Sequence, residues 1–204
     1  MKRSLFIILL LIPHFLYAQT GISCGLNVSK RTFKDAKTVT GLYAGLYHDF
    51  KISPRFYIQP HLALSMGGVK MSKDNMETVI KSNYLELPVY ASFRFPFNKE
   101  DNFVVNIGPY VAQGLFGKAK TYSDGWYETN SYNTFDEIPS LDYGIAGGVA
   151  YVNKGNSAYF FIDWMYGLKE FSNPEEENDF GKVLQIRVRL AILLPVAEVI
   201  ELNK

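Results

Sequence analysis

The stretch from Ser82 to Phe97 (SNYLELPVYASFRFPF) constrains the fold most, because apolar and polar residues alternate along nearly all of it. One set of alternate residues is apolar: Leu85, Leu87, Val89, Ala91, Phe93, Phe95 and Phe97. The other set is Tyr84, Glu86, Pro88, Tyr90, Ser92 and Arg94. Successive side chains of a strand point to opposite faces, so we predict one long strand with an apolar face and a charged face. Its length suits the roughly 9–11 residues, plus flanks, of a tilted strand that crosses a bilayer.

The same alternation recurs along the chain, and no 3.6-residue helical pattern persists between the repeats. We predict eight strands, at Gly21–Ser29, Thr38–Ile52, Phe56–Met71, Ser82–Phe97, Phe103–Gly117, Leu141–Val152, Ala158–Leu168 and Lys182–Leu194.

The charged residues indicate which face of these strands is the outside. Five of them stand in the middle of predicted strands, opposite the apolar face: Glu86, Arg94, Asp163, Arg187 and Arg189. In a soluble barrel or sandwich the apolar set would fill the interior, and eight long strands of Leu, Ile, Phe and Trp would overfill it. Turned outward, the same residues face lipid, and the charges pair in a lumen that eight strands make just wide enough for side chains.

The connections between the strands alternate strictly between short and long. The short ones are Ser53–Arg55, Asn98–Asn102 and Asn153–Ser157, and the long ones are Lys30–Lys37, Ser72–Lys81, Lys118–Ser140 and Lys169–Gly181. This order is typical of outer-membrane barrels. The predicted fold is therefore all-β: an eight-stranded antiparallel transmembrane β-barrel with short periplasmic turns and longer extracellular loops.

The N-terminus has the pattern of a secretory signal peptide over residues 1–18, which leaves 19–204 as the barrel domain. Lys2 and Arg3 supply the positive charge, Leu5–Ile12 the apolar core, and Ala18 precedes the expected cleavage site. An uncleaved anchor and a lipidated Cys24 are the alternatives. We expect export to the cell outer membrane.

Composition excludes some classes of protein. The net charge of +1 and the pI of about 7.7 give no electrostatic basis for binding nucleic acid. Cys24 is the single cysteine, so no disulfide forms within the chain.

The predicted lumen charges are placed to form ion pairs. If the last hairpin is symmetric about Lys169–Gly181, Asp163 lies opposite Arg187, and Arg189 is one inward position further. Opposite charges in adjacent inward positions satisfy each other where water is scarce. We interpret the set as a charge-paired plug; a proton or ion path is the alternative.

Ordered short segments resemble the PorT-type family of small Gram-negative outer-membrane barrels. They are Gly25-Leu26-Asn27-Val28-Ser29, Gly41-Leu42-Tyr43-Ala44-Gly45-Leu46, Ile58-Gln59-Pro60, Asn83-Tyr84-Leu85-Glu86-Leu87-Pro88, Gly108-Pro109-Tyr110, Asp142-Tyr143-Gly144, Gly147-Gly148 and Tyr166-Gly167-Leu168. The resemblance implies an eight-stranded barrel and, from the family's namesake, an association with protein export. It implies no catalytic motif. The chain departs from such barrels by continuing from Pro195 to Lys204, where they commonly stop at an aromatic residue.

The sequence shows no motif for catalysis, cofactor or metal. His48 and His61 lack a zinc-binding spacing, and no GxSxG, P-loop or GxGxxG motif occurs. We expect no cofactor and no enzymatic activity. The alternative is an enzyme with an active site at the rim, for which Asp142, Ser140 and Glu86 are the candidates.

The connection Lys118–Ser140 is the candidate extracellular binding loop, because it carries Tyr122, Trp126, Tyr127 and Tyr132 among polar residues. Amphipathic aromatic side chains suit binding surfaces; alternatively they pack on the rim or sit in lipopolysaccharide. The expected function is structural or adhesive, or assistance to a protein-export machine, and a narrow pore is a further alternative. The expected partners are outer-membrane lipid and lipopolysaccharide, with secretion-machinery or surface proteins as further partners.

Overall fold

The computed structural model describes residues 19–32, 36–73, 76–98, 101–123, 127–137, 140–153, 158–169, 172–173, 178–179 and 182–193. The predicted signal peptide (1–18) and the segment from Pro195 to Lys204 lie outside the described residues.

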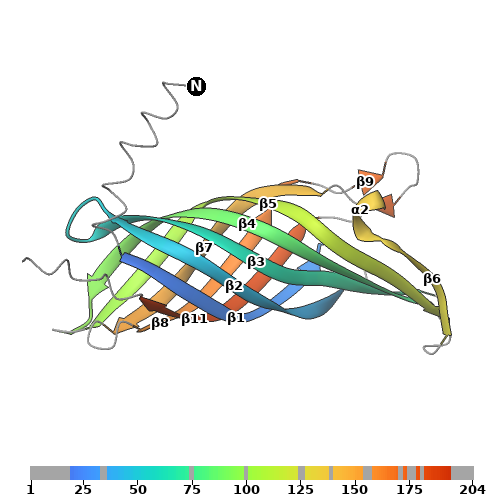
Figure 1. The fold of residues 1–204 in the computed structure, drawn as a ribbon, viewed down its shortest axis with the longest axis horizontal. Coiled ribbons are helices and arrows are strands. Elements are labelled where there is room, and N and C mark those ends of the chain that lie inside the picture. Colours follow the sequence, from blue (N-terminus) through green and yellow to red (C-terminus); the bar gives the residue numbers. More distant parts are fainter. Residues whose placement is uncertain are drawn as a thin grey trace, which may run out of the picture.

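Long antiparallel strands make up almost all of the described structure (Figure 1). They are β1 (Gln19–Arg31), β2 (Lys37–Lys51), β3 (Phe56–Lys73), β4 (Met76–Pro96), β5 (Asp101–Ser123), β6 (Tyr127–Asn133), β7 (Leu141–Asn153), β8 (Ala158–Gly167), β9 (Ser172–Asn173), β10 (Asn178–Asp179) and β11 (Val183–Leu193), with the short helix α2 (Thr134–Glu137) after β6. Within the described ranges, no helix is long and apolar enough to span a membrane.

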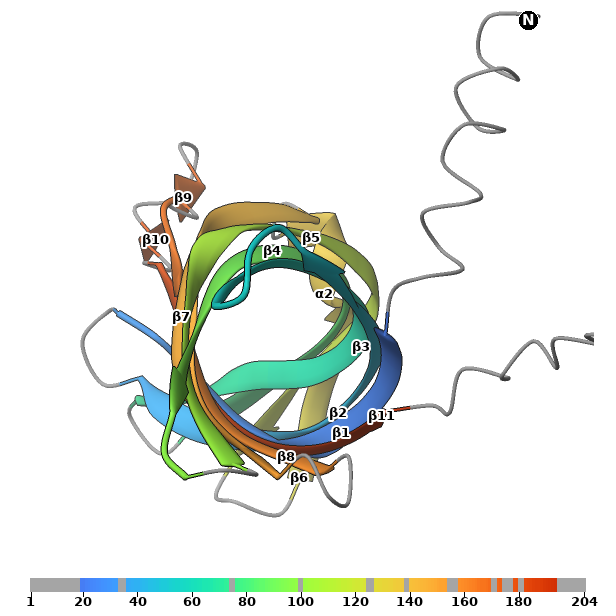
Figure 2. The ribbon, with the colours of Figure 1, turned by 90° about the vertical axis from the view of Figure 1, so that its left-hand side faces the viewer.

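The strands close into a ring, which Figure 2 shows end-on. The wall strands pair in the order β1-β2-β3-β4-β5-β7-β8-β11, and β1 pairs with β11 from Gly21↔Leu193 to Arg31↔Val183 to close the ring. Of the nine strands in this sheet, β6 pairs in the described structure with the far part of β5 only, so eight strands form the wall. The predicted eight-stranded antiparallel barrel is confirmed.

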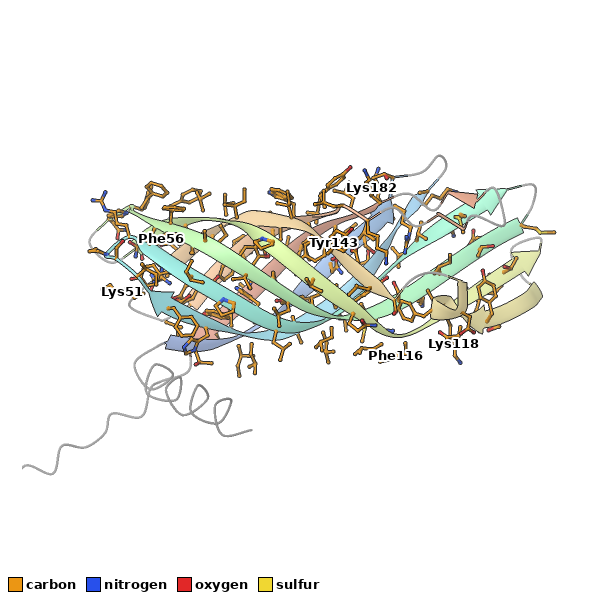
Figure 3. All side chains as sticks on the ribbon, turned by 90° about the horizontal axis from the view of Figure 1, so that it is seen from above. Lys51, Phe56, Phe116, Lys118, Tyr143 and Lys182 are labelled. Carbon is orange, nitrogen blue, oxygen red and sulfur yellow. The ribbon has the colours of Figure 1, made fainter. Side chains whose placement is uncertain are left out.

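The outer surface of the wall is apolar, and the interior holds buried charged and polar side chains together with clusters of aromatic and small ones. The exposed apolar side chains, which we call the lipid-facing band, include Ile22, Leu26, Leu42, Leu46, Leu62, Leu64, Leu87, Ile107, Val111, Ile145, Val149, Ile162, Trp164, Val188 and Leu190. Soluble proteins rarely expose contiguous apolar patches larger than a few hundred Å², so an apolar band around the whole barrel requires lipid. Figure 3 shows outward side chains between Lys51 and Phe56 at one end and Lys118 and Lys182 towards the other.

The two ends of the barrel differ. The short connections after β2, β4 and β7 lie at one end, the turn end, together with the start of β1 and the finish of β11. The remaining connections, with β6 and α2, lie at the opposite end, the loop end (Figure 1). In barrels of this architecture the turn end is periplasmic and the loop end extracellular.

Two of the connections predicted as long loops are largely strand. β4 begins at Met76 within the predicted loop Ser72–Lys81, and β5 and β6 fill much of Lys118–Ser140. The predicted strands are too short because the apolar residues change faces in this part of the sheet. Val69, Ile80 and Ala119 are apolar, point inward and are buried. We call this part of the sheet (Val69–Lys73, Met76–Ser82, Gly117–Ser123 and β6) the extension.

Candidate functional site

Three buried ion pairs fill the part of the lumen that the lipid-facing band surrounds. From the turn end inward they are Arg94 with Asp49, Arg189 with Asp163, and Arg187 with Glu86. All six residues are buried, and each is at most 8% exposed. The structure therefore places all five sequence-predicted charges (Glu86, Arg94, Asp163, Arg187 and Arg189) inside the barrel, each in an ion pair.

The Arg189–Asp163 pair is held by two hydrogen bonds. Arg189 Nε donates to Asp163 Oδ2 at 2.5 Å, and Nη2 donates to Oδ1 at 3.3 Å. The guanidinium lies 3.8 Å from the centre of the Phe161 ring, and Nη1 lies 3.3 Å from His61 Nδ1. A two-pronged pair of this kind fixes both side chains, because the planar guanidinium matches the carboxylate.

Arg187 joins opposite sides of the barrel. Its Nη2 donates to Glu86 Oε2 on β4 at 2.7 Å and to Gln185 Oε1 at 3.1 Å. Its guanidinium also lies 4.0 Å from the centre of the Tyr43 ring of β2. A side chain from the last strand thus contacts β2 and β4 across the lumen, which leaves little room for a water column.

The observed register has Arg187 opposite Asp163, as the symmetric hairpin predicts. The ion pair of Asp163, however, is with the diagonal neighbour Arg189, while Arg187 takes Glu86 from across the barrel. Diagonal positions lie within reach of long side chains, and only the closed ring brings β4 near β11.

Sequence reasoning did not single out three lumen residues that belong to this network. Asp49 accepts hydrogen bonds from Arg94 Nη2 and, at 2.5 Å, from Gln59 Nε2. Gln59 Oε1 lies 2.9 Å from His61 Nε2, so the chain of contacts continues to Arg189. Their inward positions in the alternation of β2 and β3 were the available signal.

Aromatic and small groups close the lumen at the loop end. Tyr110 donates a 2.8 Å hydrogen bond to Asp142 Oδ2. Phe135 of α2 packs edge-on against Tyr84, with ring centroids 5.6 Å apart, and covers Gly114, where an added Cβ would lie 2.3 Å from the Phe135 ring. A cavity of about 10 Å³ remains beside Tyr84, which is at the lower limit for one water molecule.

The residues considered for a rim active site have structural partners. Glu86 is paired with Arg187 and Asp142 with Tyr110, and the Ser140 carbonyl accepts a 2.6 Å hydrogen bond from the Gly114 N–H. Among the described residues, no group of three or more His, Cys, Asp or Glu side chains is placed to hold a metal ion.

Much of the candidate binding loop belongs to the extension, as the end of β5 and as β6. Its two described tyrosine side chains take different positions. Tyr122 lies on the outer face and lines a depression of about 570 Å³ with Glu77, Val79, Lys81, Lys118 and Lys120. Tyr132 packs against the apolar inner face formed by Val69, Ile80, Ala119 and Val183. Trp126 lies outside the described residues; Tyr127 is in β6, but its side chain is not described.

The comparison with protein families agrees with this architecture. The family model described as outer membrane protein beta-barrel domain matches residues 12–173. Similar solved structures include Ail, the attachment invasion locus protein of Yersinia pestis (15% identity, TM-score 0.44, covering 87% of this chain and 99% of that one). They also include Neisserial surface protein A (11%, 0.47, 87% and 99%) and OprG from Pseudomonas aeruginosa (10%, 0.46, 86% and 93%). No protein of curated function matches. Since the family model matches well over half of the 204 residues, this chain is an outer-membrane β-barrel protein and belongs to the outer membrane protein beta-barrel domain family.

Proposed function

We propose that the protein is a closed, non-enzymatic outer-membrane barrel that holds the extension above the cell surface as an adhesive or structural element. The observation that carries this proposal is the extension itself, a sheet that continues beyond the lipid-facing band with its own apolar inner face. Its outer face is polar and open to partners, with Lys81 and Lys118 exposed.

The lumen supports a closed barrel rather than a pore. Stacked ion pairs, with Phe135 above them, occupy the path that a solute would follow. The carboxylates of Glu86 and Asp142 bind Arg187 and Tyr110, which supports a structural role for them rather than acid–base catalysis. In planar bilayers we expect no stable single-channel conductance, and steady conductance would contradict this part of the proposal.

An adhesion assay tests the role of the extension. Cells of a non-adherent strain that produce the full chain should settle together, or attach to a protein-coated surface, several-fold more than cells that produce Tyr122→Ser/Trp126→Ser. The control Phe97→Ser removes an exposed aromatic side chain at the turn end and should leave attachment unchanged. Equal attachment by all three types of cell would contradict an adhesive role.

The resemblance to PorT-type barrels, carried by ordered segments along most of the mature chain, supports a second proposal: the barrel assists a protein-export machine. Cells without the protein should then retain in the periplasm proteins that are normally delivered to the surface. Unchanged export in those cells would contradict this second proposal and leave the adhesive one standing.

A further inference from the structure

The outer face of the extension carries a cluster of lysines just beyond the lipid-facing band. Lys118 stands two residues after the exposed Phe116, which is about 7 Å along a strand, and Figure 3 labels these two residues near each other. Lys81 of β4 lies directly opposite Lys118 in the register. Lys70 and Lys120 flank Val79 in the next row across β3, β4 and β5.

Such an arrangement of like charges is unfavourable for the sheet alone. Directly opposed like charges destabilise a strand pair, because their Cβ atoms are only about 4.5–5.5 Å apart. In the described part of the chain, the ammonium groups of Lys81 and Lys118 have no hydrogen bond or ion pair. Glu77 is the one acidic residue among the described residues that line the depression, and Lys70 binds it at 2.5 Å.

We propose that this depression binds a phosphate group of an outer-leaflet glycolipid, of the lipopolysaccharide type, with Lys81 and Lys118 as its principal ligands. An anion between the two ammonium groups turns their repulsion into attraction, and each lysine offers three N–H donors. Tyr122 adds an amphipathic ring and a hydroxyl group at the wall of the same depression, as aromatic residues do at membrane interfaces.

The position of the cluster favours a lipid phosphate over one in free solution. The depression lies on the outer face of the wall, and its lining runs from Lys81 and Lys118, directly beyond the band, to Glu77 and Tyr122 further along the extension. Membrane phosphates are concentrated at this level, and electrostatic attraction to a charged surface falls off within about one Debye length. A bound lipid would fix the base of the extension to the membrane.

Lipid binding to the purified full-length protein tests this proposal. Protein in neutral detergent micelles is titrated with bisphosphorylated lipid A, and the bound fraction is measured by intact-mass spectrometry. We expect one preferential lipid A per barrel, and about 25-fold weaker binding by Lys81→Gln/Lys118→Gln, at roughly fivefold for each lysine near a charged surface. The control Lys30→Gln/Lys51→Gln also removes two exposed lysine charges and should bind as the wild type does.

A second variant separates charge recognition from a structural role of the extension. Glu77→Gln removes the acidic side chain from the depression and releases Lys70, so it should bind lipid A several-fold more tightly. Weaker or unchanged binding by this variant would overturn the proposal. A heat-dependent mobility shift confirms that each variant is folded before it is titrated.

The source of the phosphate is tested in the same titration. Lipid A without its phosphate groups should lose the preferential binding, and inorganic phosphate at the same phosphate concentration should not displace bound lipid A. Displacement by inorganic phosphate, or equal binding of dephosphorylated lipid A, would overturn the assignment to a lipid phosphate. The titration measures lipid binding, and the attachment assay measures adhesion. The failure of this proposal and the failure of the proposed function are therefore seen in different experiments.

Discussion

Replacing Asp163 by asparagine tests the ion-pair network at its most buried point. The change keeps the shape of the side chain but leaves the Arg189 guanidinium, 1% exposed, beside Phe161 and His61 without its anion. Breaking a buried pair from one side costs about 3–5 kcal/mol, because an uncompensated charge stays buried. Arg189→Met should cost a similar amount, since it leaves the Asp163 carboxylate buried without its cation.

The double variant Asp163→Asn/Arg189→Met carries neither charge, so it should be more stable than the sum of the single losses predicts. We expect a coupling free energy of about 2–3 kcal/mol. The assay is urea unfolding of the protein folded in lipid vesicles, followed by the fluorescence of Trp164, which faces lipid on β8. A Trp126→Phe background removes the only other tryptophan.

A parallel cycle with Arg187→Met serves as the control, because Arg187 is the register neighbour of Asp163 but pairs with Glu86. Its coupling to Asp163 should be less than half of the Arg189 value. Additive losses in the Asp163–Arg189 cycle, or a larger coupling to Arg187, would refute the pairing described above.

Three further experiments examine the wall. Ile162→Arg in the middle of the lipid-facing band should cost about 2–4 kcal/mol in vesicle unfolding, while Leu168→Arg, next to the loop end, should cost about 0–1 kcal/mol; equal costs would contradict the placement of the band. Cys24 is exposed in the structure and lies in lipid in the membrane, so a charged maleimide should label it in urea-unfolded protein but not in vesicles. Labelling in both states would place it in water. Gly25→Ala should cost about 1–3 kcal/mol, because its Cβ would lie 2.1 Å from the carbonyl oxygen of Val188 across the closing seam. A loss of unfolding free energy below 0.5 kcal/mol in the urea assay would show that the backbone across this seam can relax.

The alternation of residues was enough to predict the barrel wall. A period of two with one apolar face places Leu62 or Ile162 outward and Glu86 or Arg187 inward wherever strands are long and regular. The predicted ends failed at Lys81 and Lys118, because beyond the band the inner face becomes apolar and the outer face charged. A prediction based on one continuous apolar face therefore ended the strands at the edge of the lipid-facing band.

The partners inside the lumen were harder to predict than the faces. Register within one hairpin follows from its symmetry, so Asp163 opposite Arg187 was accessible from the sequence. The pairing of Arg187 with Glu86 depends on closure of the ring, which brings β4 across from β11. The packing of Phe135 against Tyr84 likewise depends on how α2 folds over the mouth, and no periodicity encodes it.

Electrophoresis of the outer-membrane fraction, with and without boiling, tests the central claim most directly. A closed barrel with a lipid-facing band should be recovered in that fraction and should migrate faster unheated than boiled, because the barrel stays folded in detergent. A soluble periplasmic protein with the same mobility in both lanes would contradict the account, since its apolar face would then have to line the interior.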